Sequence, residues 1–491
     1  MCASPFPGYQ EAIPSYRSLL VFYEPSSTTF DDARKHVHEL LTILDPSKLP
    51  TPPLKEVPTV YDGDDLDDVS RQTGMSREDV IRLHSETEYR VYMVGFTPGF
   101  AYMGLTDPKL DVRRRATPRT RVPAGSVAIA MRQTAIYPSG APGGWHLLGR
   151  AEHRTLFDPN ATPPSFFVPG DRVKFVPVKA LSGLESKNEL HALSSSAPAI
   201  EVEDGGLLTT VQDRGRPGFG RYGVPVAGAM DPRALDEANR LVGNDPGAAA
   251  LECTVHGPNL RCLQATVASI SGADLGAVVE RHDLGRWHPP PGSSFRLRPG
   301  NVLAFEGARS GARAYIAFAG GIDVPLVLDS RSTYLTGGFG GYDGRTLHKG
   351  DRLALLPSSL QKAGRRIRRE PDDGGGVLRM IWGPQDDYFT DKARAILESC
   401  AYTVGASSDR MGYRLEGEPL EHRGAQQIVS DGNALGSIQV PPDGLPIVML
   451  ADRGTTGGYP KIATVLSDDI PRLVQKLPGE SVRFRAVSLL R

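Results

Sequence analysis

Cysteine is scarce in this chain, with 4 residues in 491. Cys2, Cys253, Cys262 and Cys400 are too few and too far apart for a disulfide scaffold, and no Cys-x-x-Cys pair occurs. The sequence also has no tight cluster of histidine and cysteine, so we predict no metal site. We expect reduced thiols in a cytoplasmic protein.

Long hydrophobic runs and an excess of one charge are also missing. No apolar run approaches the ~18 residues of a membrane span, and the N-terminus lacks the basic and apolar stretches of a signal peptide. The 56 Lys and Arg residues balance 57 Asp and Glu residues, for a net charge of −1. We therefore expect neither a nucleic-acid partner nor a membrane partner.

Familiar nucleotide and hydrolase motifs are absent or misplaced. There is no P-loop sequence and no Gly-x-Ser-x-Gly nucleophile elbow. Gly218–Gly223 matches Gly-x-Gly-x-x-Gly, but a dinucleotide site needs that run to open a helix. Val224-Pro225-Val226 follows instead and resists helix formation, so this pattern does not predict a Rossmann site.

Glycine and proline are abundant, at 54 and 41 residues. They are dispersed rather than periodic, and 40% of the chain is hydrophobic, which argues against collagen and bulk disorder. Dispersed glycine and proline favour short strands joined by tight turns. The predicted fold class is therefore mainly β with α+β portions.

Shifts in pattern along the chain predict its domain organisation. Helical spacing is expected in segments 30–44, 65–73, 76–85, 232–242, 391–399 and 467–475. The predicted units are a small α+β subdomain at 1–88, a barrel or compact sandwich at 89–180, a linker at 181–198, a first β subdomain at 199–356, a linker at 357–376 and a second β subdomain at 377–491.

Two sets of segments resemble known families, and together they span nearly the whole chain. Those of the first half resemble allophanate hydrolase subunit 1, whose bacterial members include the B subunit of 5-oxoprolinase: Gly95–Met103, Pro118–Ala130, Gln133–Pro138 and Pro142–Trp145. Those of the second half resemble allophanate hydrolase subunit 2, or the C subunit of 5-oxoprolinase: Thr209–Arg216, Gly228–Pro232, Ala238–Asn244, Ala319–Pro325, Ser330–Leu335, Ser408–Gly412 and Thr455–Lys461.

The resemblance implies cyclophilin-like β-barrels in both halves and a fusion of the B and C subunits of 5-oxoprolinase. In that system a third protein, the A subunit, works with the pair to open 5-oxoproline to glutamate with ATP hydrolysis. The resemblance thus implies ATP, with or without Mg²⁺, a partner similar to the 5-oxoprolinase A subunit and a small-molecule amide substrate. Homo-oligomer formation stays open.

The resemblance also leaves two alternative functions open. The same families form the carboxyltransferase part of biotin-dependent urea carboxylase. There the part similar to subunit 2 precedes the part similar to subunit 1, which is the opposite of the order in this chain. This chain lacks the Met-Lys-Met biotinylation signal, so a carboxyltransferase component would need a separate biotin carrier. A third possibility is a non-catalytic binding protein, similar to a family member that inhibits a histidine kinase.

Two departures from the family pattern concern local shape. Members usually begin with an extra strand and helix, whereas 13 residues precede Pro14. We expect an incomplete first subdomain whose sheet has an exposed edge. Met131, Arg132 and Ala135 stand where members often have glycines, which puts the shape of that turn in question.

Three residues of the last unit are candidates for catalysis. A lactam is a stable amide, so opening it requires cations and N–H donors for developing charge and a base for water. Lys461 follows a Gly-Gly-Tyr-Pro turn that could hold its ammonium near an oxygen; a surface lysine is the alternative. Asp452 and Asp443 could act as the base or as the partner of Lys461, although an Asp before Gly444 also fits a turn.

Four residues of the first half are candidates for substrate binding. Arg119 and Arg121 alternate along one strand and could clamp a phosphate or a carboxylate, or be solvated. Gln133 and Tyr137 could orient an amide by hydrogen bonds.

Four residues of the second half complete the substrate-binding set. Gln212 and Asp213 fall in an expected loop, where they either contact substrate or form a turn. Asp409-Arg410 could bind a carboxylate bidentately or form an internal ion pair.

Overall fold

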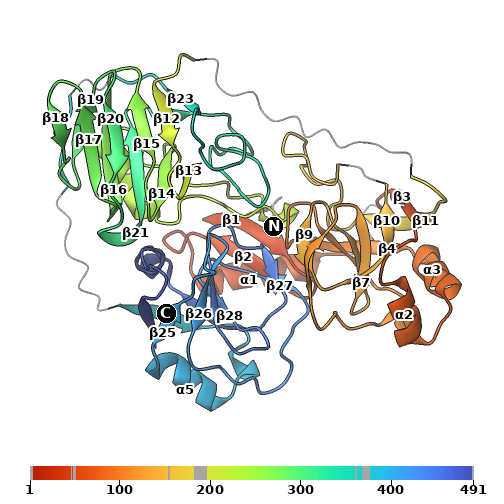
Figure 1. Cartoon of the computed structure of the whole chain (residues 1–491). Coiled ribbons are helices and arrows are strands. Elements are labelled where there is room, and N and C mark those ends of the chain that lie inside the picture. Colours follow the sequence, from red (N-terminus) through yellow and green to blue (C-terminus); the bar gives the residue numbers. More distant parts are fainter. Residues whose placement is uncertain are drawn as a thin grey trace.

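Short strands close into a seven-stranded barrel in each half of the chain (Figure 1). The computed structural model describes residues 4–45, 47, 51–152, 155–181, 196–359, 362–367 and 376–488. The prediction of a mainly β, cyclophilin-like architecture with a barrel in each half is confirmed. Most of the predicted linker 181–198 and half of the predicted linker 357–376 lie outside the described residues.

The first barrel has the strand order β10-β3-β11-β4-β5-β8-β7. Its strands are β3 (Leu54–Val60), β4 (Tyr89–Val94), β5 (Ala101–Gly104), β7 (Ser126–Ala130), β8 (Gln133–Ile136), β10 (His146–Ala151) and β11 (Arg172–Pro177). β3 comes from the range 1–88, which was predicted to be a separate subdomain. That boundary needs correction, because β3 pairs in parallel with β11 and buries Val57 in the barrel core.

Two helices lie in predicted helical segments, but they cover the outside of this barrel instead of belonging to a separate subdomain. α2 (Leu66–Thr73) ends at Gly74, whose φ of 70° suits glycine. α3 (Arg77–Glu86) begins after Ser76, whose side chain accepts a hydrogen bond from Asp79 N. Their apolar faces pack against residues of β7 and β10.

The turn between β7 and β8 is tight, although the two residues that form it are not glycines. Met131 and Arg132 have φ values of 49° and 61°, so both residues adopt the left-handed conformation that glycine adopts more easily.

The N-terminal ribbon consists of β1 (Tyr9–Pro14) and β2 (Leu19–Tyr23), which pair with each other. α1 (Phe30–Ile43) follows; Ala33 is buried, whereas Ile43 is 76% exposed. In Figure 1 the ribbon lies between the β-rich unit of the second half and the two barrels.

The first β subdomain of the second half is a pair of packed sheets. One sheet contains β12 (Ile200–Asp204), β15 (Asn259–Cys262), β17 (Ala277–Arg281), β18 (Gly285–Trp287), β20 (Val302–Phe305), β22 (Ile322–Asp323) and β23 (Arg352–Leu355). The other contains β13 (Leu208–Gln212), β14 (Ala250–Thr254), β16 (Thr266–Asp274), β19 (Ser294–Leu297) and β21 (Ser310–Phe318). Both sheets contribute to one apolar core, and α4 (Pro232–Leu241) packs on β16 and β21.

The second barrel repeats the topology of the first, with the order β24-β31-β28-β29-β26-β25-β32. Its strands are β24 (Val377–Trp382), β25 (Tyr402–Val404), β26 (Gly412–Glu416), β28 (Ser437–Gln439), β29 (Ile447–Met449), β31 (Lys461–Val465) and β32 (Ser481–Ala486). In each barrel the first and last strands pair in parallel. Its helices, α5 (Asp391–Ser399) and α6 (Ile470–Val474), fall in predicted segments.

Each barrel also has a short antiparallel pair beside it. β6 (Arg119–Val122) pairs with β9 (Ala141–Gly143), and β27 (Asp431–Gly432) pairs with β30 (Thr456–Gly457). The two pairs occupy equivalent places in the two chain segments, so similar edges of both barrels are available to form a site.

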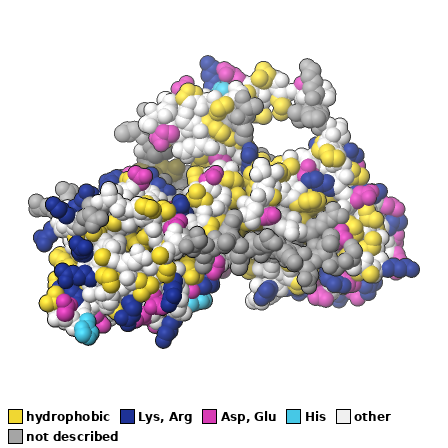
Figure 2. Space-filling model, turned by 90° about the horizontal axis from the view of Figure 1, so that it is seen from above, with side chains coloured by type: hydrophobic (Ala, Val, Ile, Leu, Met, Phe, Trp, Pro, Cys, Tyr) yellow, Lys and Arg dark blue, Asp and Glu magenta, His cyan; other side chains and the backbone are white. Residues whose placement is uncertain are grey.

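The surface and the helices are consistent with the composition. Basic and acidic side chains are interspersed over the face shown in Figure 2. Within the described ranges, no helix combines the length and hydropathy of a membrane span.

The ribbon is anchored to the second half by Glu11. Its carboxylate accepts hydrogen bonds from Gly220 N at 2.6 Å and Gly218 N at 3.2 Å, within the glycine-rich run that resembles a dinucleotide motif. That run forms the 3₁₀ turn η3 (Gly220–Tyr222), not a long helix.

Replacing Glu11 by Ala should destabilise the protein by about 1–3 kcal/mol, because buried N–H groups of the glycine-rich turn lose their acceptor. Urea denaturation measures this loss. Glu39→Ala, on the exposed surface of α1, is the matched control and should stay within about 0.5 kcal/mol of the wild type. Equal stability of the two variants would contradict the anchoring role.

Candidate functional site

Apart from the Glu11 contact, the two halves meet where the N-terminal ribbon and the loop after β4 contact the β27–β30 pair. Phe96 N donates to Thr456 Oγ1 at 3.1 Å, and the Ser18 hydroxyl donates to Asp431. In Figure 1 β27 lies beside the ribbon, between the two barrels. Groups from both halves therefore border this junction.

Lys461, the first residue of β31, is buried at the junction. Its side chain is 3% exposed, and Nζ lies 3.0 Å from Asp431 Oδ2. Asp431 also accepts hydrogen bonds from Ser18 and from Gln385 Nε2, the latter at 3.1 Å. Lys461 is thus not a surface lysine, and its ion-pair partner is Asp431 rather than the expected Asp452 or Asp443.

The carboxyl group of Asp431 is stabilised as a carboxylate. Burial alone would raise its pKa, but the Ser18 hydrogen bond and the Lys461 ammonium hold the pKa below its ordinary value. The Asp431 carboxyl group is therefore ionised at neutral pH.

Consecutive glycines bring further polar groups close to this pair. A Cβ on Gly457 would stand 2.0 Å from Gln439 Nε2, and one on Gly458 would stand 2.8 Å from Arg114 Nη1. Gln439 is also paired with Lys461 across β28 and β31. The glycines are required for this close approach.

Tyr102 completes the junction from the side of the first barrel. Burial raises the pKa of its hydroxyl, which the Arg114 charge and the side chains of Ser430 and Thr456 partly oppose. We refer to Tyr102, Arg114, Asp431, Gln439 and Lys461 together as the junction cluster.

The two candidate arginines of β6 behave differently. Arg119 Nη2 donates to Asp65 Oδ1 at 2.8 Å. Although burial opposes ionisation of Asp65, hydrogen bonds from Arg119 and the Leu147 amide keep the pKa of this carboxyl below its ordinary value. Arg121 is exposed beside Gly140. Neither arginine belongs to the junction cluster.

The candidates Gln133 and Tyr137 are both buried in the first barrel. Both amide atoms of Gln133 lack a well-aligned hydrogen-bond partner among the residues that the structure describes. Tyr137 packs edge-on against Phe100, and its burial raises the pKa of its phenol, with Tyr102 adding to the shift. Tyr137 therefore lies near the junction cluster.

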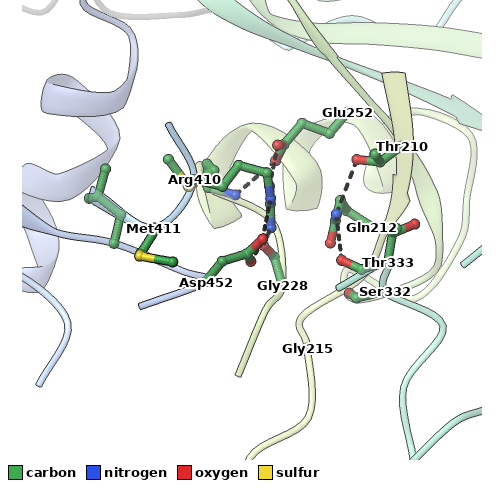
Figure 3. Close-up of polar contacts among 12 residues, drawn as sticks. Thr210, Gln212, Gly215, Gly228, Glu252, Ser332, Thr333, Arg410, Met411 and Asp452 are labelled. Atoms are coloured by element: carbon green, nitrogen blue, oxygen red, sulfur yellow. Dashed lines mark hydrogen bonds and ion pairs between the residues drawn. The ribbon is translucent and has the colours of Figure 1, made fainter. Parts of the chain in front are cut away.

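A second group of candidates forms a buried ion-pair cluster between the packed sheets and the second barrel (Figure 3). Arg410 donates to Asp452 at 2.9 and 3.1 Å, to Gly228 O at 2.7 Å and also to Glu252. The three charged side chains are at most 6% exposed. This arrangement is the internal ion pair left open by the sequence.

Burial acts on the two carboxyl groups of this cluster with different results. Burial raises the pKa of Asp452, and the Arg410 charge offsets this only in part. Burial also opposes ionisation of Glu252, but the charges of Arg410 and Arg313 lower its pKa below the ordinary value. Asp452 is thus the ion-pair partner of Arg410 and not of Lys461.

Gln212 and Asp213 lie beside the ion-pair cluster, but Gln212 is the last residue of β13 and pairs with Ala250, so it is not in the expected loop. Gln212 Nε2 donates to Thr210 Oγ1 and Thr333 O, both at 3.1 Å, as Figure 3 shows. The Asp213 carboxylate accepts from Gly215 N at 2.7 Å and from groups of segment 330–332. The contacts of Asp213 support the turn-forming alternative, whereas Gln212 joins a strand to segment 330–333 and forms no turn.

Asp409 and Asp443 are exposed turn residues. Asp409 Oδ1 accepts from Met411 N at 2.8 Å, and Asp443 Oδ1 accepts from Leu445 N at 3.0 Å. The structure therefore does not place Asp443 with Lys461, because its side chain serves the local turn before Gly444.

The sequence interpretation missed four residues at the junction: Ser18, Arg114, Asp431 and Gln439. Arg114 lies in a run of three arginines, and Asp431 precedes a glycine. Such signals are common on protein surfaces, so neither distinguishes a site residue from a solvated one.

Family models match both parts of the chain. The model of the carboxyltransferase domain, subdomain C and D, matches residues 1–167. The model of the carboxyltransferase domain, subdomain A and B, matches residues 222–486.

Relatives and a solved structure extend these matches. The C subunit of 5-oxoprolinase from Escherichia coli (strain K12) is 35% identical over 298 residues, covering 59% of this chain and 92% of that protein. The B subunit of 5-oxoprolinase from Bacillus subtilis (strain 168) is 39% identical over 185 residues, covering 35% and 77%. The crystal structure of TTHA0988 matches with a TM-score of 0.86 and 37% identity, over 98% of this chain and 94% of that chain.

Replacing Arg410 by Met should cost about 3–5 kcal/mol of stability, because Glu252 and Asp452 would remain buried without their counter-charge. Urea denaturation measures the loss. Arg414→Met, on the exposed face of β26, is the control and should have little effect. If both variants lost the same amount of stability, the buried ion pair would not be a major source of stability.

The lowered pKa of Asp431 predicts how its contribution depends on pH. The unfolded carboxyl has a pKa of about 3.9, so the stabilisation is fully present above that value and is lost as pH falls through the lower folded pKa. The stability difference between wild type and Asp431→Asn should be constant from pH 7 to 5 and shrink below about pH 4. A difference that grows on acidification would contradict this sign.

Proposed function

Because the chain belongs to the carboxyltransferase domain family, with subdomains C and D ahead of A and B, we propose that it is the fused B–C component of an ATP-dependent 5-oxoprolinase. Its reaction would open the 5-oxoproline lactam to glutamate. The observation that carries the proposal is the buried Lys461–Asp431 pair at the junction of the two halves.

Lys461 is suited to stabilise negative charge on a carbonyl oxygen. Its ammonium has three N–H donors, of which one is directed to Asp431. No second acceptor contacts Nζ in the described part of the chain. In the proposed reaction Lys461 donates to the lactam oxygen as charge develops there, and Asp431 fixes the direction of the ammonium.

Ser18 gives the first half a part in this arrangement. Its hydroxyl holds the Asp431 oxygen that Lys461 does not contact. Orientation of the lysine therefore depends on the ribbon of the first half, which supports joint action of the two halves.

ATP would supply a phosphoryl group that activates the lactam oxygen. Within the described ranges, no group of three His, Cys, Asp or Glu side chains is placed to hold a metal ion. We assign no residue of this chain to ATP binding or to phosphoryl transfer. The proposal also includes a partner similar to the 5-oxoprolinase A subunit.

The family description favours a carboxyltransferase as the second candidate. Here the same lysine would stabilise the carbonyl of a carboxyl group delivered by a separate biotin carrier. Urea carboxylation in the presence of such a carrier, without glutamate formation from 5-oxoproline, would select this alternative.

The chain mixed with a homologue of the 5-oxoprolinase A subunit, 5-oxoproline and ATP should produce glutamate and ADP. In this assay Lys461→Gln should lower kcat by roughly 10²–10³-fold, because an oriented donor to the developing charge is lost. Coupled detection of ADP and chromatographic detection of glutamate measure the two products.

Lys392→Gln is the matched control, since Lys392 is exposed on α5. It should retain the wild-type rate. If Lys461→Gln were as active as this control, Lys461 would have no catalytic part, and a non-catalytic binding role would be favoured.

A further inference from the structure

We propose that Arg114 binds the carboxylate of the substrate and thereby selects lactams that carry an acid group. This inference rests on the proposed function, because it assigns the recognition of substrate to the same junction cluster.

Arg114 differs from its neighbours in the run Arg113–Arg115. Arg115 forms an ion pair with Asp65, as Arg119 does. Arg113 is exposed. Arg114 is half-buried, and its guanidinium extends to Gly458 of the second half.

The Arg114 guanidinium has no carboxylate partner in the described ranges, and its buried Nε atom has no hydrogen-bond acceptor there. A buried donor without an acceptor is costly. Arg114, with this unpaired donor at the junction of the two halves, is therefore well suited to donate hydrogen bonds to a ligand.

The remaining unpaired groups nearby indicate what the ligand offers. Gln439 Nε2 is a buried donor without an acceptor among the described residues, and it lies beside Gly457, next to Gly458. Lys461 lies opposite Gln439, so Arg114, Gln439 and Lys461 all bring N–H donors to the cluster. Its carboxylate, Asp431, already accepts from Lys461, Ser18 and Gln385. A ligand that fits must carry acceptors, including an anionic one.

A five-membered lactam with an acid group has this chemistry. Its carboxylate can accept a bidentate pair of hydrogen bonds from a guanidinium, and its ring carbonyl can accept from an ammonium or amide. Arg114 and Lys461 would then hold opposite ends of one small molecule. Urea and 2-pyrrolidone have the carbonyl but no carboxylate, so Arg114 would favour 5-oxoproline over both.

The test is the affinity of Arg114→Gln for two lactams, measured by calorimetry on the full chain. Affinity for 5-oxoproline should fall by roughly 10- to 100-fold, the loss expected for hydrogen bonds to a charged group. Affinity for 2-pyrrolidone should be unchanged. In the glutamate assay KM for 5-oxoproline should rise by a similar factor, while kcat changes less than threefold.

Arg113→Gln is the matched control and should behave as the wild type. Arg114→Lys keeps the charge but not the fork of donors, and should give an intermediate affinity. Thermal unfolding of each variant checks that the fold is retained; if Arg114→Gln does not fold, Arg114→Lys decides by the same criterion.

Several outcomes would overturn the inference. These are equal weakening of both lactams, unchanged affinity for 5-oxoproline, and no binding of 5-oxoproline by the wild type. The inference would also be overturned if Arg114→Gln no longer bound inorganic phosphate or ATP but still bound 5-oxoproline normally. The anion bound by Arg114 would then be a phosphate. Arginine-dependent 5-oxoproline binding without glutamate formation would support the inference and refute the proposed function.

Discussion

The ion pair between Lys461 and Asp431 is the contact on which the site depends. An ammonium is removed from water only where a carboxylate compensates its charge, and here the carboxylate comes from β27, 30 residues earlier in the chain. Asp431 is in turn held by Ser18 of the N-terminal ribbon. Docking of the first half onto the second is therefore linked directly to the position of the lysine.

The repeated barrel topology explains why such a site can form. The two barrels have the same strand order, with a parallel pair joining first and last strands. Each also has a short strand pair at an equivalent place, which ends in a Gly-Gly sequence before the next barrel strand. The side chains at the equivalent ends differ: β10 begins with His146 and β31 with Lys461. A common scaffold thus presents two chemically different edges.

The glycine-rich run at 218–223 shows how structure resolves an ambiguous motif. Its backbone N–H groups do bind an anion, as glycine-rich loops often do. The anion is the Glu11 carboxylate of the same chain, and no long helix follows. The sequence argument against a dinucleotide site rested on Val224-Pro225-Val226, whereas the use of the run as a docking point became evident only in the structure.

Local patterns in the sequence determined the helices α1 to α5, strands such as β24, and the presence of strand-rich halves, because periodicity and capping act over a few residues. The family motifs determined the barrels and pointed to Lys461. The tertiary structure decided the charge partners of these residues. Lys461 pairs with Asp431, and Arg410 pairs with Glu252 and Asp452. Arg114 has no carboxylate partner among the described residues. Charge pairing acts through space between residues up to hundreds of positions apart, and a single sequence carries no record of that proximity.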